Sequence, residues 1–103
     1  MFKLQPNPTF FAKVGIPIAG QEKPEVIDVE YKYLTRTALK SYFEGLKGKT
    51  DAQALGEIVI GWRIPDVEFS ASALEALIDN YPAAAEAFFD TFKAELMEAK
   101  RKN

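Results

Sequence analysis

The strongest constraint on the fold is an alternation of apolar and polar side chains over residues 27–33, within a segment that spans residues 25–34. The apolar members are Ile27, Val29, Tyr31 and Tyr33. A period of two predicts a β-strand with one buried face and one exposed face. A weaker alternation of Val14, Ile16 and Ile18 predicts a second strand over residues 10–19, and a polar turn over residues 20–24 separates the two. These two strands are expected to form an antiparallel hairpin.

Four helices are expected after the hairpin, because apolar side chains now recur every three to four residues. The expected segments are residues 35–46 capped by Thr35 or Thr37, residues 51–62 capped by Asp51, a helix capped by Ser72 with Glu75, and a last helix from Pro82 to about residue 100. Strands followed by helices, without β-α-β alternation, indicate an α+β fold. We therefore predict one domain over residues 1–103, an N-terminal antiparallel β-hairpin followed by a bundle of about four helices.

Within the first predicted strand, Pro17 has no backbone N–H to donate to a neighbouring strand. Proline in such a segment indicates the edge of a sheet or the end of a strand. The first strand is therefore expected at an edge.

The composition excludes most catalytic chemistry, because the chain has no cysteine and no histidine. Thiolate metal sites, disulfides and histidine-assisted nucleophiles cannot be built without them. Gly48, Lys49 and Thr50 resemble the end of a phosphate-binding loop, but that motif needs a glycine where Phe43 stands. The pair Asp66 and Glu68 is best interpreted as a solvated loop. We expect no enzyme activity, no cofactor and no metal site.

The charge distribution is uneven although the net charge is only −2. Residues 35–50 carry an excess of three positive charges, whereas residues 51–98 contain ten acidic and two basic residues. No basic stripe with interleaved aromatic residues is present, so nucleic-acid binding is not expected. No apolar run approaches the ~20 residues of a membrane helix, and no signal peptide is evident. The chain is expected to be soluble and cytoplasmic, without a membrane partner.

Protein binding is the remaining class of function, and aromatic side chains are its best candidates. The candidate contact residues are Phe10, Trp62, Phe88, Phe89 and Phe92. Trp62 has two interpretations, either a buried anchor of the core or a contact hot spot, since tryptophan serves both purposes. The three phenylalanines of the last helix span more than one helix face, so one of them is expected to point away from the core.

Several short motifs, in this order along nearly the whole chain, carry a resemblance to a known family. They are Pro8-Thr9-Phe10, Val29-Glu30-Tyr31, Gly61-Trp62, Pro65-Asp66-Val67-Glu68, Phe69-Ser70, Tyr81-Pro82 and the closing residues 99–103. The arrangement resembles the small tail assembly chaperones of long-tailed bacteriophages and prophages. The turn after the tryptophan is more compact than in that family, so a function of that loop is not carried over.

The resemblance implies a role without catalysis. Such chaperones bind the long tape measure protein, help tail tube subunits gather around it, and leave the finished virion; they tend to self-associate. The implied partners are therefore the tape measure protein, the tail tube protein and a second copy of the chain, in the cytoplasm of the bacterial host. The alternatives are a structural tail component that stays in the virion, such as a tube or terminator subunit, and a small ligand-binding module or enzyme.

Overall fold

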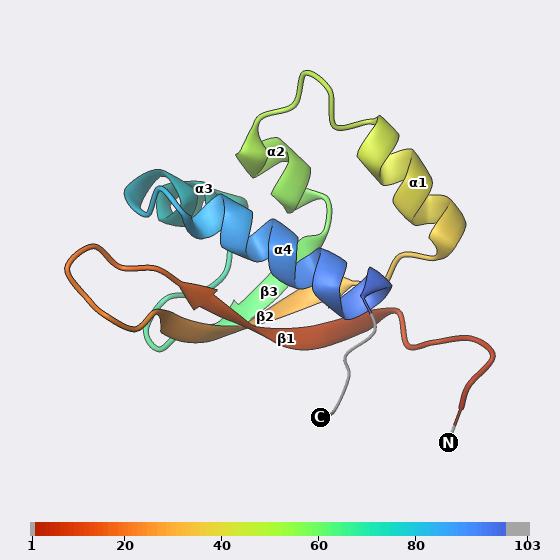
Figure 1. The fold of residues 1–103 in the computed structure, drawn as a ribbon, viewed down its shortest axis with the longest axis horizontal. Helices are drawn as coiled ribbons and strands as arrows, with labels where there is room; N and C mark the ends of the chain where they lie inside the picture. The colour runs from red at the N-terminus through yellow and green to blue at the C-terminus, as the bar shows by residue number, and fades with distance from the viewer. Residues whose placement is uncertain (1, 99–103) are drawn as a thin grey trace.

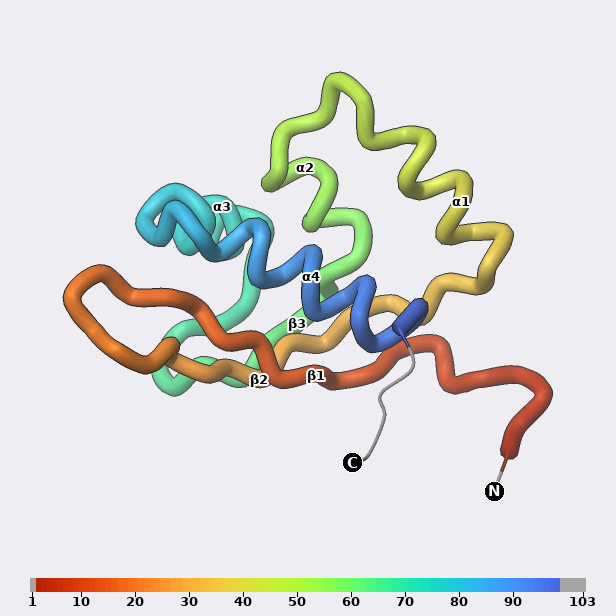
Figure 2. Tube along the Cα trace, viewed as in Figure 1, coloured from red at the N-terminus to blue at the C-terminus, as the bar shows by residue number. Residues whose placement is uncertain are grey.

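The structure, a computed structural model, describes residues 2–98 and has an α+β fold (Figure 1). In chain order, the elements are β1 (Thr9–Ile16), β2 (Glu25–Lys32), α1 (Arg36–Glu44), α2 (Asp51–Gly56), β3 (Val59–Arg63), α3 (Ala71–Asn80) and α4 (Ala84–Met97). The strands form one antiparallel sheet in the order β1-β2-β3. The helices lie together on one face of this sheet, which confirms the predicted fold class (Figure 2).

The N-terminal hairpin follows the predicted alternation. Phe10 pairs with Tyr31 and Val14 with Ile27, so these side chains share the face that the helices cover. Gly20 adopts φ +86° in the connection, a conformation that glycine reaches without steric cost. β1 ends at Ile16, just before proline would interrupt the ladder, and it is an edge strand as expected.

The prediction of one helix over residues 51–62 is wrong, because α2 ends at Gly56 and a third strand follows it. Three consecutive β-branched residues, Ile58, Val59 and Ile60, favour extended structure over helix. The open edge of β2 also offers unpaired backbone groups, and Lys32 N–H donates to the Ile58 carbonyl at 2.8 Å. The apolar spacing of this segment suits either a helix or a strand, and pairing with the edge of β2 selects the strand.

The helix caps differ from the prediction by one or two residues. Thr35, one of the two expected residues, caps α1 through the Ala38 N–H. Thr50, not Asp51, caps α2 in a capping box with Gln53. Ser70, not Ser72, accepts from the Ala73 N–H at the start of α3, so Ser72 already lies inside that helix.

The last helix begins later and ends earlier than predicted. Pro82 lies in the turn that precedes α4, where Ala84 N–H donates to the Tyr81 carbonyl. α4 ends at Met97. The expected continuation to residue 100 and the closing motif 99–103 lie outside the described residues.

The core lies between the sheet and the helical layer. Its largest fully buried side chains are Tyr31, Phe88, Phe92, Leu55, Ile58, Leu74, Val14 and Val29. α4 crosses β1, and α2, α3 and α4 contact one another. Four helices are therefore present in residues 2–98, as expected, but they form a layer on the sheet, and a bundle of all four is not confirmed.

Candidate functional site

Two of the five aromatic candidates are unavailable to a partner. Phe88 and Phe92 are 0% exposed, and both point from α4 into the core. The ring of Phe92 lies 5.3 Å from that of Tyr31, centroid to centroid. We therefore remove both residues from the candidate surface, because their apolar periodicity reflects packing on the sheet.

Phe10 and Trp62 are half-buried and already engaged within the chain. The Phe10 ring stacks on Tyr31 with a centroid distance of 5.5 Å. Trp62, on β3, donates from Nε1 to the Val67 carbonyl at 2.9 Å and meets the Phe69 ring edge-on at 5.0 Å. Of its two interpretations, these contacts favour an anchor, since Trp62 holds the loop between β3 and α3 against the sheet.

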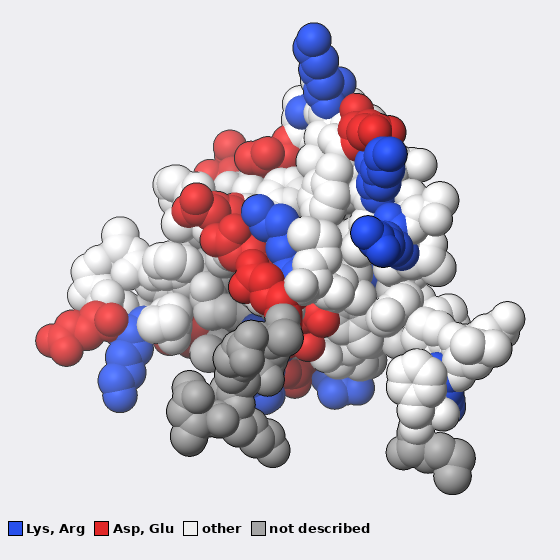
Figure 3. All heavy atoms as spheres, turned by 45° about the vertical axis from the view of Figure 1, so that its right-hand side comes forward, with Lys and Arg blue, Asp and Glu red and all other residues white. Residues whose placement is uncertain are grey.

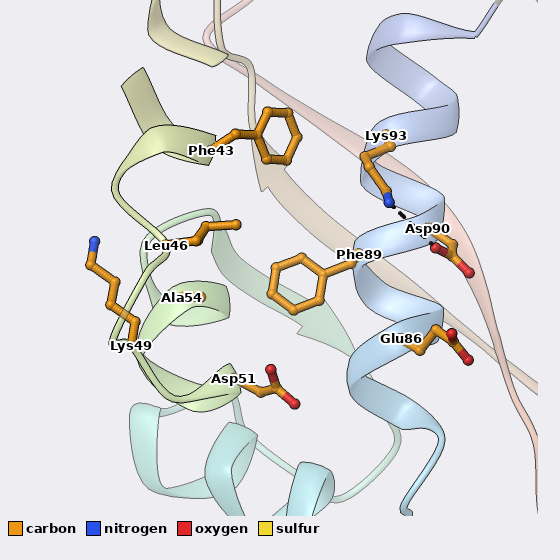
Figure 4. Close-up of a pocket in the computed structure, with 9 residues that line it drawn as sticks. All are labelled: Phe43, Leu46, Lys49, Asp51, Ala54, Glu86, Phe89, Asp90 and Lys93. Atoms are coloured by element: carbon orange, nitrogen blue, oxygen red, sulfur yellow. Dashed lines mark ion pairs between the residues drawn. The ribbon is translucent and has the colours of Figure 1, made fainter. Parts of the chain in front are cut away.

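Phe89 is the candidate that points away from the core centre. It lines a hollow of about 440 Å³ between α4 and the segment that joins α1 to α2. Figure 4 shows Phe89 pointing from α4 toward Leu46 and Phe43 on the opposite wall. All three side chains are half-buried, so the floor of this hollow is apolar and open to solvent.

A second hollow, of about 510 Å³, lies farther along α1 and α4, and Phe43 lines both hollows. Its lining residues are Tyr33, Leu34, Arg36, Leu39, Lys40, Phe43, Leu96 and Met97. We call the two hollows together the α1–α4 groove. Its floor and rim include apolar side chains from both of its walls.

Charged side chains of both signs line the first hollow, whereas those of the second are basic. In the first hollow, Glu86, Asp90 and Lys93 lie on α4, and Lys49 and Asp51 lie on the opposite wall. In the second, Arg36 and Lys40 lie on α1. Figure 3 shows acidic side chains gathered over α4 with a basic side chain beside them, and mainly basic side chains over α1. The charge therefore varies along the groove, from mixed charges in the first hollow to basic side chains in the second.

The acidic end of the groove has charges that are not matched within the chain. Asp51 and Glu86 make no ion pair with any residue in the described range 2–98. Lys49, also at this end, pairs with Glu57, which lies outside the groove. Asp90 has Lys93 at 3.8 Å, a long contact on one helix face. Two carboxylates thus remain to meet cationic groups of an occupant.

Two tyrosine hydroxyls fix the elements that form the groove. Tyr31 on β2 donates to the Phe88 carbonyl of α4 at 2.8 Å, and Tyr42 on α1 donates to the Ala54 carbonyl of α2 at 2.7 Å. Burial, with a smaller effect from Glu57, raises the pKa of Tyr42 to about 12. Burial and then Glu95 raise the pKa of Tyr31 further. Both hydroxyls therefore stay protonated and act as structural donors.

Within the part of the chain that the structure describes, no cluster of three or more acidic side chains could hold a metal ion. None of the helices in residues 2–98 has the length and apolar character needed to span a bilayer.

Comparison with known proteins identifies the family. The family model for phage tail assembly chaperones matches residues 1–103, the whole chain. The chain belongs to the phage tail assembly chaperone family. This finding confirms the resemblance predicted from the sequence motifs and assigns the chain to tail assembly. No curated protein and no solved structure matches it.

For this family member, sequence reasoning missed most of the groove. Phe43 and Leu46 fall within the helix predicted over residues 35–46, whose apolar side chains were expected to face the core, but both are only half-buried and Leu46 lies beyond the end of α1. Glu86 and Asp90 gave no signal, because an acidic helix face is ordinary in isolation. One usable signal was the adjacent pair Phe88 and Phe89, since neighbouring helical residues point about 100° apart and cannot both face the core.

Proposed function

We propose that this chaperone binds the tape measure protein of its own phage and helps to bring tail tube subunits to it. It does so by protein contacts alone, without catalysis, in the cytoplasm of the bacterial host, and it is absent from the finished virion. Self-association of the chain accompanies this role. Phe89 is the aromatic contact residue that we retain for the partner, with Trp62 and Phe10 as supports of the surface.

The match of the family model over the whole chain is the observation that carries this proposal. The groove supports it, because an open apolar floor bordered by charges suits a protein partner. A floor built from Phe43, Leu46 and Phe89 offers aromatic anchors of the type enriched in protein interfaces. Binding of this kind needs neither histidine nor cysteine.

The test is co-expression with the tape measure protein of the same phage. We expect the tape measure protein to become soluble and to co-purify with an affinity-tagged copy of the chaperone. A major tail protein added to the same cells should join the complex. If the tape measure protein stays insoluble and unbound while the chaperone is folded, the proposed partner is wrong.

Purified virions separate this role from that of a structural tail component. Mass spectrometry of the particles should detect the tube and tape measure proteins but not this chain. A stoichiometric amount of the chain in the virion would identify it as a retained tube or terminator subunit instead.

A further inference from the structure

The segment before β1, residues 2–8, carries the most exposed of the large apolar side chains in residues 2–98, and we call it the N-terminal arm. Phe2 and Leu4 are both 91% exposed, more than any other large apolar side chain in that range. A single exposed apolar residue is common on a protein surface, but two on one short segment form a patch of the kind that binds another protein. The arm therefore needs a cover that its own chain does not supply.

The arm is attached to the fold only at its base. The Tyr33 N–H donates to the Pro8 carbonyl at 2.8 Å, and Lys3 donates to Asn7 Oδ1 within the arm at 2.8 Å. Pro6 and Pro8 have no N–H to donate, so the arm does not extend β1 along the sheet. Figure 1 shows the arm leaving the start of β1 and running away from the helical layer. Fully extended, its seven residues would reach roughly 20 Å from the fold.

The first hollow of the α1–α4 groove has the complementary property, an apolar floor without a cover. Phe43, Leu46 and Phe89 form this floor, and all three side chains are open to solvent in a hollow of about 440 Å³. The arm offers two apolar side chains without a site, and the hollow offers an apolar site without an occupant.

Charge selects the first hollow over the second as the site for the arm. Lys3 makes no ion pair within residues 2–98, and neither does Asp51. Figure 4 shows Asp51 pointing from α2 toward α4 across the first hollow. The charged side chains of the second hollow are Arg36 and Lys40, which would repel Lys3.

We propose that two copies of the chain exchange their N-terminal arms, so that Phe2 and Leu4 of each copy enter the first hollow of the other and Lys3 lies beside Asp51. In an extended segment, Phe2 and Leu4 point to one side and Lys3 to the other, which leaves the ammonium group at the rim. A two-fold exchange covers both arms and both hollows with the same contacts. The proposal names a surface for the self-association proposed above.

The buried area is enough for a specific but reversible dimer. Burial of two large apolar side chains removes on the order of 150 Å² each from solvent, which gives about 600 Å² for the two arms together. The two hollows lose about as much, so the total is roughly 1,200 Å², at the lower limit for specific interfaces. We therefore expect a dimer that dissociates on dilution.

Arm exchange also has a consequence for the client. Phe89 lines the hollow that the arm enters, so the arm and a tape measure protein bound at Phe89 exclude each other. The second copy then keeps the apolar floor covered until the client displaces it. This consequence alone rests on the proposed client; the exchange itself rests on the arm and the hollow.

Disulfide cross-linking tests the contact directly, because the natural chain has no cysteine. Purified L4C and L46C chains, each with a C-terminal tag of different size, are mixed and oxidised with oxidised glutathione. We expect a disulfide between the two chains. The matched control replaces L46C with S72C, which is exposed on α3 outside both hollows, and should give no such product. Equal yields from the two mixtures would overturn the proposal.

A chain that carries both L4C and L46C distinguishes exchange from folding back. Under the same oxidation we expect a disulfide between two copies, with a yield that falls on dilution. A disulfide within one chain, at a yield independent of concentration, would show that the arm covers its own hollow and would overturn the exchange.

Sedimentation velocity measures what the arm contributes to the dimer. We expect F2S/L4S to sediment as a monomer at concentrations where wild type is a dimer. V26S/V67S removes two exposed apolar side chains outside the arm and the first hollow, and it should stay dimeric. A monomeric wild type, or a dimeric F2S/L4S, would refute the exchange.

Charge reversal tests where the arm lies. K3E and D51K should each weaken the dimer roughly tenfold, since two such contacts form in each dimer, and K3E/D51K should restore it. If the double variant is no tighter than either single variant, the placement of Lys3 beside Asp51 is wrong.

Pull-down of the tape measure protein separates this inference from the proposed function. We expect F2S/L4S to retain the client at lower concentration than wild type does, because no arm competes for the floor. Retention of the client by wild type together with a dimeric F2S/L4S would refute the exchange and leave the proposed function intact. Arm cross-links as expected, with no client in any pull-down, would refute the proposed client while the exchange stands.

Discussion

Phe88 and Phe89 are adjacent in α4, yet the structure gives them different roles. Phe88 is fully buried, and its carbonyl accepts the Tyr31 hydroxyl, whereas Phe89 is half-buried at the floor of the groove. Replacing each with alanine therefore tests the division between core and site. The two variants have the same composition and the same change of helix propensity, so each is a control for the other.

The expected magnitudes follow from burial. Phe88→Ala should reduce the free energy of unfolding by about 3–5 kcal/mol, because it removes a fully buried ring and leaves a cavity. That loss is a large share of the ~5–15 kcal/mol that stabilises a small domain. Phe89→Ala should cost about 1 kcal/mol, since part of its ring is already exposed to solvent in the hollow.

Urea denaturation followed by circular dichroism measures both changes on one scale. In a thermal melt of the same variants, the melting temperature should fall by roughly 15–25 °C for Phe88→Ala, at about 5 °C per kcal/mol. For Phe89→Ala it should fall by roughly 5 °C. Phe89→Ala should nevertheless lose binding of the tape measure protein, whereas the milder Phe88→Leu should keep it. Equal destabilisation by the two alanine variants would refute the assignment of Phe89 to the groove floor.

Three further changes test the capping, the loop anchor and the buried hydroxyl. Thr50→Ala should lower the free energy of unfolding by about 1 kcal/mol, because the cap of α2 is lost, and Gln53→Ala should cost less by the same denaturation assay. Trp62→Phe should leave the fold intact but speed amide exchange around Val67, since the Nε1 donor is removed. The pKa of Tyr42 rises on folding to about 12, so its contribution to stability is complete below about pH 10 and is lost as the pH rises toward 12. Alkaline unfolding monitored by circular dichroism should be less steep in Tyr42→Phe, and an identical profile would contradict the assigned cause.

The hairpin could be predicted because its apolar period matches only a strand. Val29 and Tyr31 alternate with charged residues, and no helix would gather them on one face. The segment around Ile58 and Val59 was ambiguous, since its spacing suits both a helix and a strand. The open edge of β2 decided it, and that edge is a property of the assembled sheet. Local sequence could not supply that information.

The groove was unpredictable for a related reason. The first hollow brings together Phe43 and Glu86, which are more than forty positions apart in the sequence. Each lining segment is ordinary when taken alone, and only the packing of α4 beside α1 and α2 brings the segments together. The caps were displaced because more than one residue near each helix start can serve, Thr50 or Asp51 for α2 and Ser70 or Ser72 for α3, and only the packed turn selects Thr50 and Ser70.

The buried tyrosine hydroxyls have a consequence for the energetics of recognition. Tyr31 ties α4 to the sheet and Tyr42 ties α1 to α2, so the walls of the groove are held at a fixed separation before any partner arrives. A preorganised receptor loses little conformational entropy on association, and the ordering cost then falls on the incoming segment. Partner segments that already hold their bound conformation in the free state should consequently associate faster and more tightly than segments that must become ordered in the groove.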